Sequence, residues 1–176
     1  MTTATWAELE AAFPQATRAR EAWKQMPVAH LATVRRDGSP RIHPVCPHVA
    51  SGRLYVIVGD ESPKRFDLAN DTRFALHAID IGEPGPDFDE FEFSLTGRAR
   101  RVPLSEVATW TAVREVCFYE FPDEHWLFEL EIESALSATW DPIGAPGRRA
   151  YRLMWRAGWD APRAPSNERP VEGDRA

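Results

Sequence analysis

The chain has 176 residues, of which 43% are hydrophobic, and this is enough for one domain with a sizeable core. Its formal net charge of -6 argues against bulk binding to nucleic acid, which generally requires a basic face. No apolar run approaches the roughly 20 residues that cross a bilayer, and the N-terminus lacks the basic start and apolar stretch of a signal peptide.

The N-terminal region, residues 5–25, is rich in helix-forming residues. Thr5, with Glu8 three positions later, matches the capping box that begins a helix. Pro14 is expected to break or kink this helix, because proline removes a backbone donor and clashes with the preceding turn.

Three short apolar runs with strand character follow, over residues 28–35, 41–50 and 54–58. They are joined by Asp37-Gly38 and Ser51-Gly52, which are hairpin turn signals. The second run contains two prolines, so we expect it at an edge or bulged. Interrupted pairing there would leave backbone groups free for a ligand.

A short helix is predicted over residues 63–70, directly after the third strand. The segment that opens it is Ser62-Pro63-Lys64-Arg65. Free N–H groups and the positive end of the helix dipole attract anions, and Lys64 and Arg65 add charge. This pattern predicts a phosphate seat that suits a phosphorylated cofactor.

The rest of the chain continues mainly as strands. We predict strands over 73–79, 90–102, 126–133 and 150–156, a loop over 82–89 and a helix over 104–116. The strand that starts at Trp126 alternates apolar and acidic residues, which predicts an acidic outer face. The chain is therefore mainly β with short helices (α+β), and its closely spaced strands predict a closed or partly closed antiparallel barrel.

We expect a single domain over residues 1–158. It comprises an N-terminal helix at 5–25, a barrel at about 27–140 and a C-terminal arm at about 150–158. The polar, proline-rich segment 159–176 is expected to be disordered. Two cysteines make no disulfide framework, so we expect a cytoplasmic protein. From the acidic net charge and the lack of a long apolar run, we expect neither a nucleic-acid nor a membrane partner.

Four segments resemble one family when they are taken together in this order and spacing. They are LATVRRDGSP (31–40), SGRLYV (51–56), SPKRFDLANDTRFALH (62–77) and LTGRARRV (95–102). Through these four segments, the chain resembles the pyridoxamine 5'-phosphate oxidase-like family of flavin-binding split barrels. The resemblance implies a six-stranded antiparallel split β-barrel of Greek-key type, and a homodimer with flavin mononucleotide (FMN) sites at the subunit interface.

The resemblance also implies the site residues. Phosphate contacts would come from the helix start and the second strand, through Ser62, Lys64, Arg65, His43 and His48. The ring would face the backbone around Pro44, Val45, Ile57 and Val58. In a dimer, Trp140 would either cover the partner's flavin ring or pack in the interface or the core. The oxidase itself has Arg and Lys where this chain has the two histidines, and a Thr or Ser near Ile57 and Val58. These departures predict weakened flavin binding.

The implied function is an FMN-dependent oxidoreductase that acts on a small-molecule substrate, with no assigned catalytic residue. A deazaflavin coenzyme remains an alternative, since a wider basic groove for its acidic tail would be available from Lys64, Arg65, Arg41, Arg98 and Arg100. Non-catalytic binding of flavin or haem is a further alternative, as is a barrel whose cofactor site has decayed. On a strand His43 points away from Cys46 and His48, so we expect no metal site.

Overall fold

The computed structural model describes residues 2–25, 27–80, 90–142 and 144–165, with four helices and eight strands. The helices are α1 (Trp6–Ala12), α2 (Gln15–Gln25), α3 (Pro63–Asn70) and α4 (Val107–Val116). The strands are β1 (Ala29–Val34), β2 (Pro40–Val45), β3 (Pro47–Ala50), β4 (Arg53–Val58), β5 (Arg73–Asp80), β6 (Phe91–Val102), β7 (Trp126–Trp140) and β8 (Ala150–Arg156).

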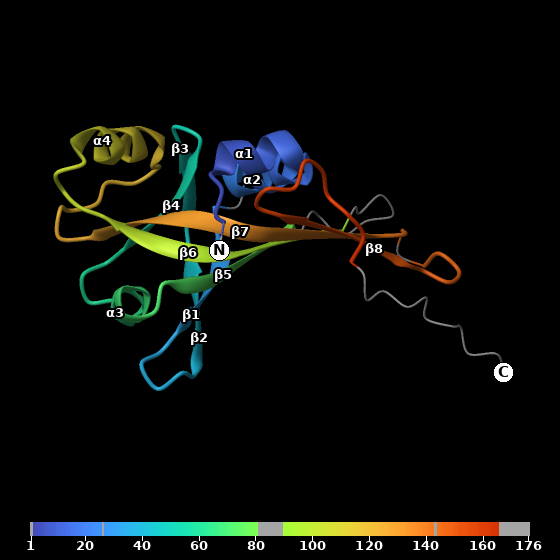
Figure 1. The fold of residues 1–176 in the computed structure, drawn as a ribbon, viewed down its shortest axis with the longest axis horizontal. Helices are drawn as coiled ribbons and strands as arrows, with labels where there is room; N and C mark the ends of the chain where they lie inside the picture. The colour runs from blue at the N-terminus through green and yellow to red at the C-terminus, as the bar shows by residue number, and fades with distance from the viewer. Residues whose placement is uncertain (1, 26, 81–89, 143, 166–176) are drawn as a thin grey trace.

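All eight strands belong to one antiparallel sheet with the order β2-β1-β5-β6-β7-β4-β3, to which β8 adds by pairing with β7. Figure 1 shows the long strands β6 and β7 through the middle, with α1, α2 and α4 on one side and α3 on the other. The expected mainly antiparallel β architecture is confirmed, and the expected count of six strands is wrong.

The count differs because the predicted strand over 41–50 is two strands. β2 ends at Val45 and β3 begins at Pro47, with Cys46 in neither. Proline donates no ladder hydrogen bond, so continuous pairing fails at this point. β2 and β3 form the two ends of the sheet path, and the chain itself connects those ends at Cys46. β8 adds the other strand.

The first helix begins as its sequence predicts. The Thr5 backbone N–H donates to the Glu8 carboxylate at 2.7 Å, and the Glu8 N–H donates to the Thr5 hydroxyl at 3.3 Å. Pro14 separates α1 from α2, as expected. Trp6 and Phe13 are fully buried, so these helices contribute to the main core against the sheet.

The predicted acidic outer face of the strand beginning at Trp126 is wrong at one position. Glu129 is only 2% exposed, although Glu131 and Glu133 are partly exposed. Arg53 binds one Glu129 oxygen and Arg100 binds the other at 2.6 Å. A buried carboxylate is tolerated when it is paired in this way.

The described part of the expected disordered tail is bonded to β8. Met154 and Arg163 exchange two backbone hydrogen bonds of 2.8 Å, and the Trp155 indole N–H donates to the Trp159 carbonyl at 2.9 Å. These bonds hold the chain against β8 as far as Arg163. The rest of the tail, from residue 166, lies outside the described residues, as does the loop expected at 82–89.

Among the described residues, no helix has the length and apolar character needed to cross a membrane.

Candidate functional site

Because strand pairing is interrupted at Cys46, one side of β2 and the end of β4 have backbone groups without a ladder partner. β3 pairs with β4 only as far as Val56, so Ile57 and Val58 of β4 have no partner on that side in the described ladder. β2 pairs with β1 along one side only and ends the sheet on the other. The result is a split in the barrel, lined by free backbone groups.

Helix α3 begins five residues after Val58 and therefore follows directly from this split. Ser62 is its N-cap residue, but the Ser62 side chain makes no capping hydrogen bond. The first turn contains no acidic residue. The Ser62 hydroxyl and the positive end of the α3 dipole are therefore available to an anion, while Lys64 and Arg65 supply the charge.

Lys64 is half-buried, and burial lowers the pKa of its ammonium group, an effect that negative charge on the neighbouring Cys46 sulfur partly opposes. His43 also interacts electrostatically with Lys64. The structure thus brings together Lys64 and His43 beside Cys46, at the split. Within the described residues, no carboxylate forms an ion pair with Lys64.

Both histidines that the family comparison suggested for phosphate binding are held neutral. Burial lowers the pKa of His43, and the positive charges of Lys64 and Arg41 lower it further. Burial alone lowers the pKa of His48. At pH 7 neither imidazole contributes a positive charge, so each can donate one hydrogen bond and accept one but adds no charge to bind an anion.

Arg41 does not replace the missing cation, because it is already paired. Its Nε lies 2.8 Å from Asp67, a buried carboxylate of α3 that also accepts a 2.9 Å hydrogen bond from the Thr33 hydroxyl. These contacts connect α3 to β1 and β2. Asp67 therefore fixes the helix against the barrel and neutralises Arg41.

The other cations considered for a wide basic groove are also paired with carboxylates. Arg98 lies 3.1 Å from Glu133, and Arg100 lies 2.7 Å from Glu106 and 2.6 Å from Glu129. This arrangement leaves Lys64 and Arg65 as the permanent charges of the seat.

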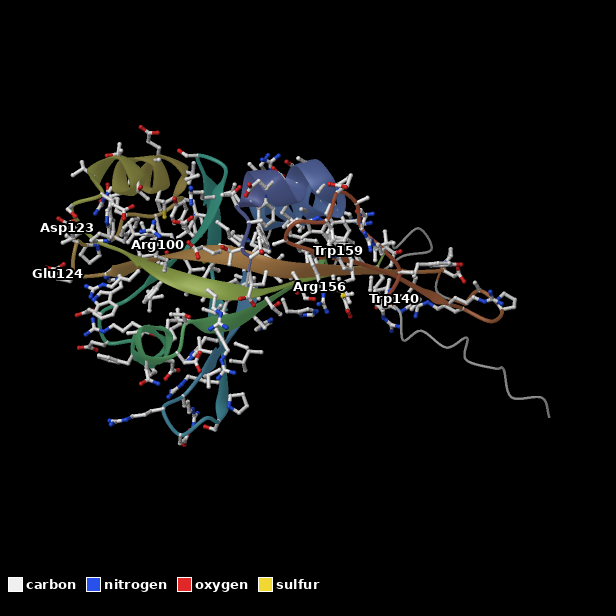
Figure 2. The ribbon with its side chains drawn as sticks, in the orientation of Figure 1. Arg100, Asp123, Glu124, Trp140, Arg156 and Trp159 are labelled. Atoms are coloured by element: carbon white, nitrogen blue, oxygen red, sulfur yellow. The ribbon has the colours of Figure 1, made fainter. Side chains whose placement is uncertain are left out.

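Of the four predicted ring-facing residues, Pro44 has an exposed side chain, whereas Val45, Ile57 and Val58 are buried and offer only backbone at the split. The side chains of Val45 and Val58 belong to the main core, and that of Ile57 belongs to a second cluster under α4. Trp140 lies on the β7–β8 arm, well away from α3 in the same chain (Figures 1 and 2). Any contact between Trp140 and the seat would require a second chain.

His48 lies apart from the seat, in a pocket of about 540 Å³ formed between α2, β3 and the end of α4. Its Nε2 is 3.8 Å from the Cys117 sulfur, and its ring is 6.0 Å from that of Phe118. The full lining is Arg20, Trp23, Lys24, Pro27, Pro47, His48, Val49, Val116 and Phe118. In the part of the chain that is described, no three His, Cys, Asp or Glu side chains are grouped to hold a metal ion.

Sequence reasoning missed a cationic cluster beside the seat. The guanidinium carbons of Arg65 and Arg101 lie 4.8 Å and 3.5 Å from the centre of the Trp126 ring. Arg101 is on β6 and Trp126 is on β7, so only the strand pairing places them together. No local signal in the sequence connects them.

A family model described as pyridoxamine 5'-phosphate oxidase matches residues 16–132. No curated protein matches the chain by sequence. Solved structures with the same fold include a heme binding protein from Mycobacterium smegmatis, which is 20% identical with a TM-score of 0.57. That match covers 76% of this chain, and this chain spans only 55% of that protein's length.

Two further structures have similar folds at low identity. PhzG from Burkholderia lata 383, solved with tetrahydrophenazine-1-carboxylic acid, is 13% identical with a TM-score of 0.57, over 88% of this chain and 93% of its own. A conserved hypothetical protein from Mycobacterium tuberculosis is 17% identical with a TM-score of 0.53, over 72% and 84% of the two chains. These likenesses concern the fold. With the family model covering most of the chain, the protein belongs to the pyridoxamine 5'-phosphate oxidase family.

Proposed function

We propose that the chain binds FMN with the phosphate at the start of α3, and that as a homodimer it transfers electrons to or from a small organic substrate. The observation that carries this proposal is Lys64, a half-buried cation for which the described residues supply no carboxylate partner. An anion at this place would offset the cost of its burial. When bound, FMN supplies hydride chemistry at its N5 position.

The residues at the split fit a flavin phosphate, with fewer charges than the family resemblance implies for the oxidase. Lys64 and Arg65 are cationic, the Ser62 hydroxyl is available, and the neutral His43 can offer one hydrogen bond. The free backbone of Ile57 and Val58 supports ring binding without a hydroxyl contact. We therefore expect measurable but modest FMN affinity.

The ion pairs of Arg41, Arg98 and Arg100 weigh against the deazaflavin alternative, because these cations already have carboxylate partners. Whether the bound flavin turns over is a separate question from whether it binds. Oxidation of a reduced nicotinamide in the presence of an acceptor would support an enzyme, and its absence in a flavin-loaded sample would favour a non-catalytic carrier.

Haem binding is a second candidate, and His48 is the observation that favours it. A neutral imidazole in an apolar pocket is the usual protein ligand for haem iron. His48 is 5% exposed, burial keeps its pKa low, and Trp23 and Phe118 line the same pocket. The heme binding protein from Mycobacterium smegmatis has a similar fold.

The first experiment is the visible spectrum of the purified protein, followed by titration with FMN and, separately, with haem. Saturable FMN binding would support the proposal, and a Soret band that is lost in His48→Ala would support haem instead. Binding of neither ligand would contradict both proposed functions and would favour the alternative of a barrel whose cofactor site has decayed.

The phosphate seat itself is tested with Lys64→Gln. Removing one charged hydrogen bond is expected to weaken FMN binding by about 1.5–3 kcal/mol. The matched control is Lys24→Gln, because Lys24 is an exposed lysine of α2 paired with Glu21 at 2.8 Å. Equal FMN affinity in the natural chain and in Lys64→Gln, measured by calorimetry, would rule out this seat.

A further inference from the structure

Arg65, at the edge of the seat at Lys64, also forms a cationic pair with Arg101, an arginine that this seat does not use. Arg65 is half-buried and Arg101 is exposed. Within the described ranges neither guanidinium has a carboxylate partner, in contrast with the neighbouring arginines Arg41, Arg98 and Arg100. The Nε of Arg65 is buried without any hydrogen-bond acceptor among the described residues. Two like charges that contact one aromatic ring, Trp126, and have no counter-ion among the described residues are a site to which an anion is attracted.

Aromatic rings hold the two guanidinium groups in place. Both lie over the Trp126 ring, and Arg65 also lies 4.5 Å from the centre of the Phe66 ring. The Phe66 and Trp126 rings are 6.4 Å apart. Contact of the guanidinium carbon with a ring does not consume the terminal N–H groups, and terminal N–H groups can bind phosphate oxygens in pairs.

The carboxylates around the pair do not neutralise it directly. Asp60 and Glu61 precede the helix and are exposed, and neither forms an ion pair with Arg65 or Arg101. Asp123 lies 2.5 Å from Arg114. Glu124, next to Asp123 at the turn before β7, is exposed (Figure 2). These charges will reduce the attraction for an anion at long range, and they leave both guanidinium edges unbound.

The pair lies on the other flank of the same helical turn as the seat. Consecutive residues of a helix point about 100° apart. Lys64 is directed toward Cys46 and His43 at the split, and Arg65 is directed toward Trp126 at the start of β7. A ligand whose first phosphate sits at the start of α3 can therefore extend toward Arg65 and Arg101.

We propose that Arg65 and Arg101 form a second anion seat, which binds a further anionic group of the ligand held at Lys64. A diphosphate is the simplest ligand with this chemistry. The inference rests on the proposed function, because the first phosphate must occupy the start of α3. It predicts that the site prefers ligands with a second charged group over FMN itself.

Two probes with the same ring system test this preference. FMN carries one phosphate, and riboflavin 5'-diphosphate carries two. We expect the natural chain to bind the diphosphate roughly tenfold more tightly than FMN at low salt, because a second charge-assisted contact is made. The difference should shrink as salt is added, since the pair is partly exposed.

Arg101→Gln should remove that advantage and change FMN affinity by less than about twofold, because Arg101 belongs to the second seat and not to the one that holds the first phosphate. Arg101→Lys should retain part of the advantage. The control is Arg73→Gln, which removes the same charge from an arginine paired with Asp71 at the far end of α3. Equal affinity for the two probes in the natural chain would overturn the inference.

The two proposals fail in different ways. If FMN binds and Lys64→Gln weakens it, but the diphosphate gains nothing, the second seat is wrong and the first stands. If neither probe binds to the natural chain, the proposed function is wrong, and the second seat is wrong with it. Thermal denaturation of each variant verifies that lost binding does not reflect lost folding.

Discussion

His48 is a titratable side chain in an apolar place. It is 5% exposed and packs against the aromatic rings of Phe118 and Tyr119. Its nearest polar neighbour is the Cys117 sulfur at 3.8 Å, a weak partner. Burial lowers the pKa of His48 and raises that of Tyr119 to about 12, so both are neutral at pH 7.

The lowered pKa of His48 predicts how stability changes with pH. In the unfolded chain a histidine takes up a proton at about pH 6.5, whereas the folded chain resists this uptake. Below that pH the unfolded state binds more protons, so the free energy of unfolding falls as pH falls. Above about pH 6.5, the contribution of the neutral His48 to the free energy of unfolding is fully present.

His48→Gln should therefore flatten the loss of stability between pH 7 and pH 5, measured by urea denaturation at each pH. Part of the pH dependence of stability should remain in this variant, because the pKa of His43 is also lowered. His30→Gln is the control, because His30 is exposed. The prediction is wrong if both variants keep the slope of the natural chain.

At the scale of elements, the antiparallel pairing of β6 with β7 contains a β-bulge. Their register shifts between Thr96 and Gly97. A Cβ atom on Gly97 would lie 1.9 Å from the Glu131 carbonyl oxygen and 3.0 Å from the Phe74 ring. Only glycine permits this close approach of two backbones.

Gly97→Ala should destabilise the fold by at least about 3 kcal/mol, because backbone atoms of β7 must move. The comparison is Gly59→Ala, whose added Cβ would meet the His125 ring at 3.5 Å, an ordinary contact. Gly59→Ala should lower the free energy of unfolding, measured with denaturant, by less than about 1 kcal/mol. Similar losses in the two variants would contradict the bulge.

At the scale of the whole molecule, large apolar side chains are exposed around α4 and the turn after it. Val107, Val116 and Phe118 are 67%, 48% and 62% exposed, and Tyr119 is 38% exposed. The rings of Phe118 and Tyr119 are 5.0 Å apart, so they form one surface. Such surfaces on soluble proteins commonly bind other chains.

We expect light scattering to give twice the 19.9 kDa of one chain, as the proposed homodimer requires. Phe118→Asp should shift the mass toward one chain, because it places a charge in the apolar surface. Ser105→Asp adds the same charge at an exposed position near α4 and should leave the mass unchanged. A natural chain of 19.9 kDa at micromolar concentration would contradict the dimer.

Local patterns determined several of the elements and the cationic start of α3. The capping pattern of Thr5 and Glu8 places the start of α1, and the predicted 63–70 helix coincides with α3. Both depend on neighbouring residues, whose side-chain and backbone preferences act over a single turn. The family resemblance likewise depends on short segments in a fixed order, and the family model confirms it.

Tertiary structure decided which charges are available. Arg41 and Asp67 are 26 positions apart in the sequence, and Arg100 meets Glu129 only because β6 pairs with β7. Alternation along a strand shows which residues share a face but not what lies opposite, so the buried Glu129 was placed outside. The sequence alone determined that a cationic helix start follows a strand. The tertiary structure decided that Lys64, Arg65 and Arg101 have no carboxylate partner among the described residues, because the carboxylates of neighbouring elements pair with Arg41, Arg98 and Arg100 instead.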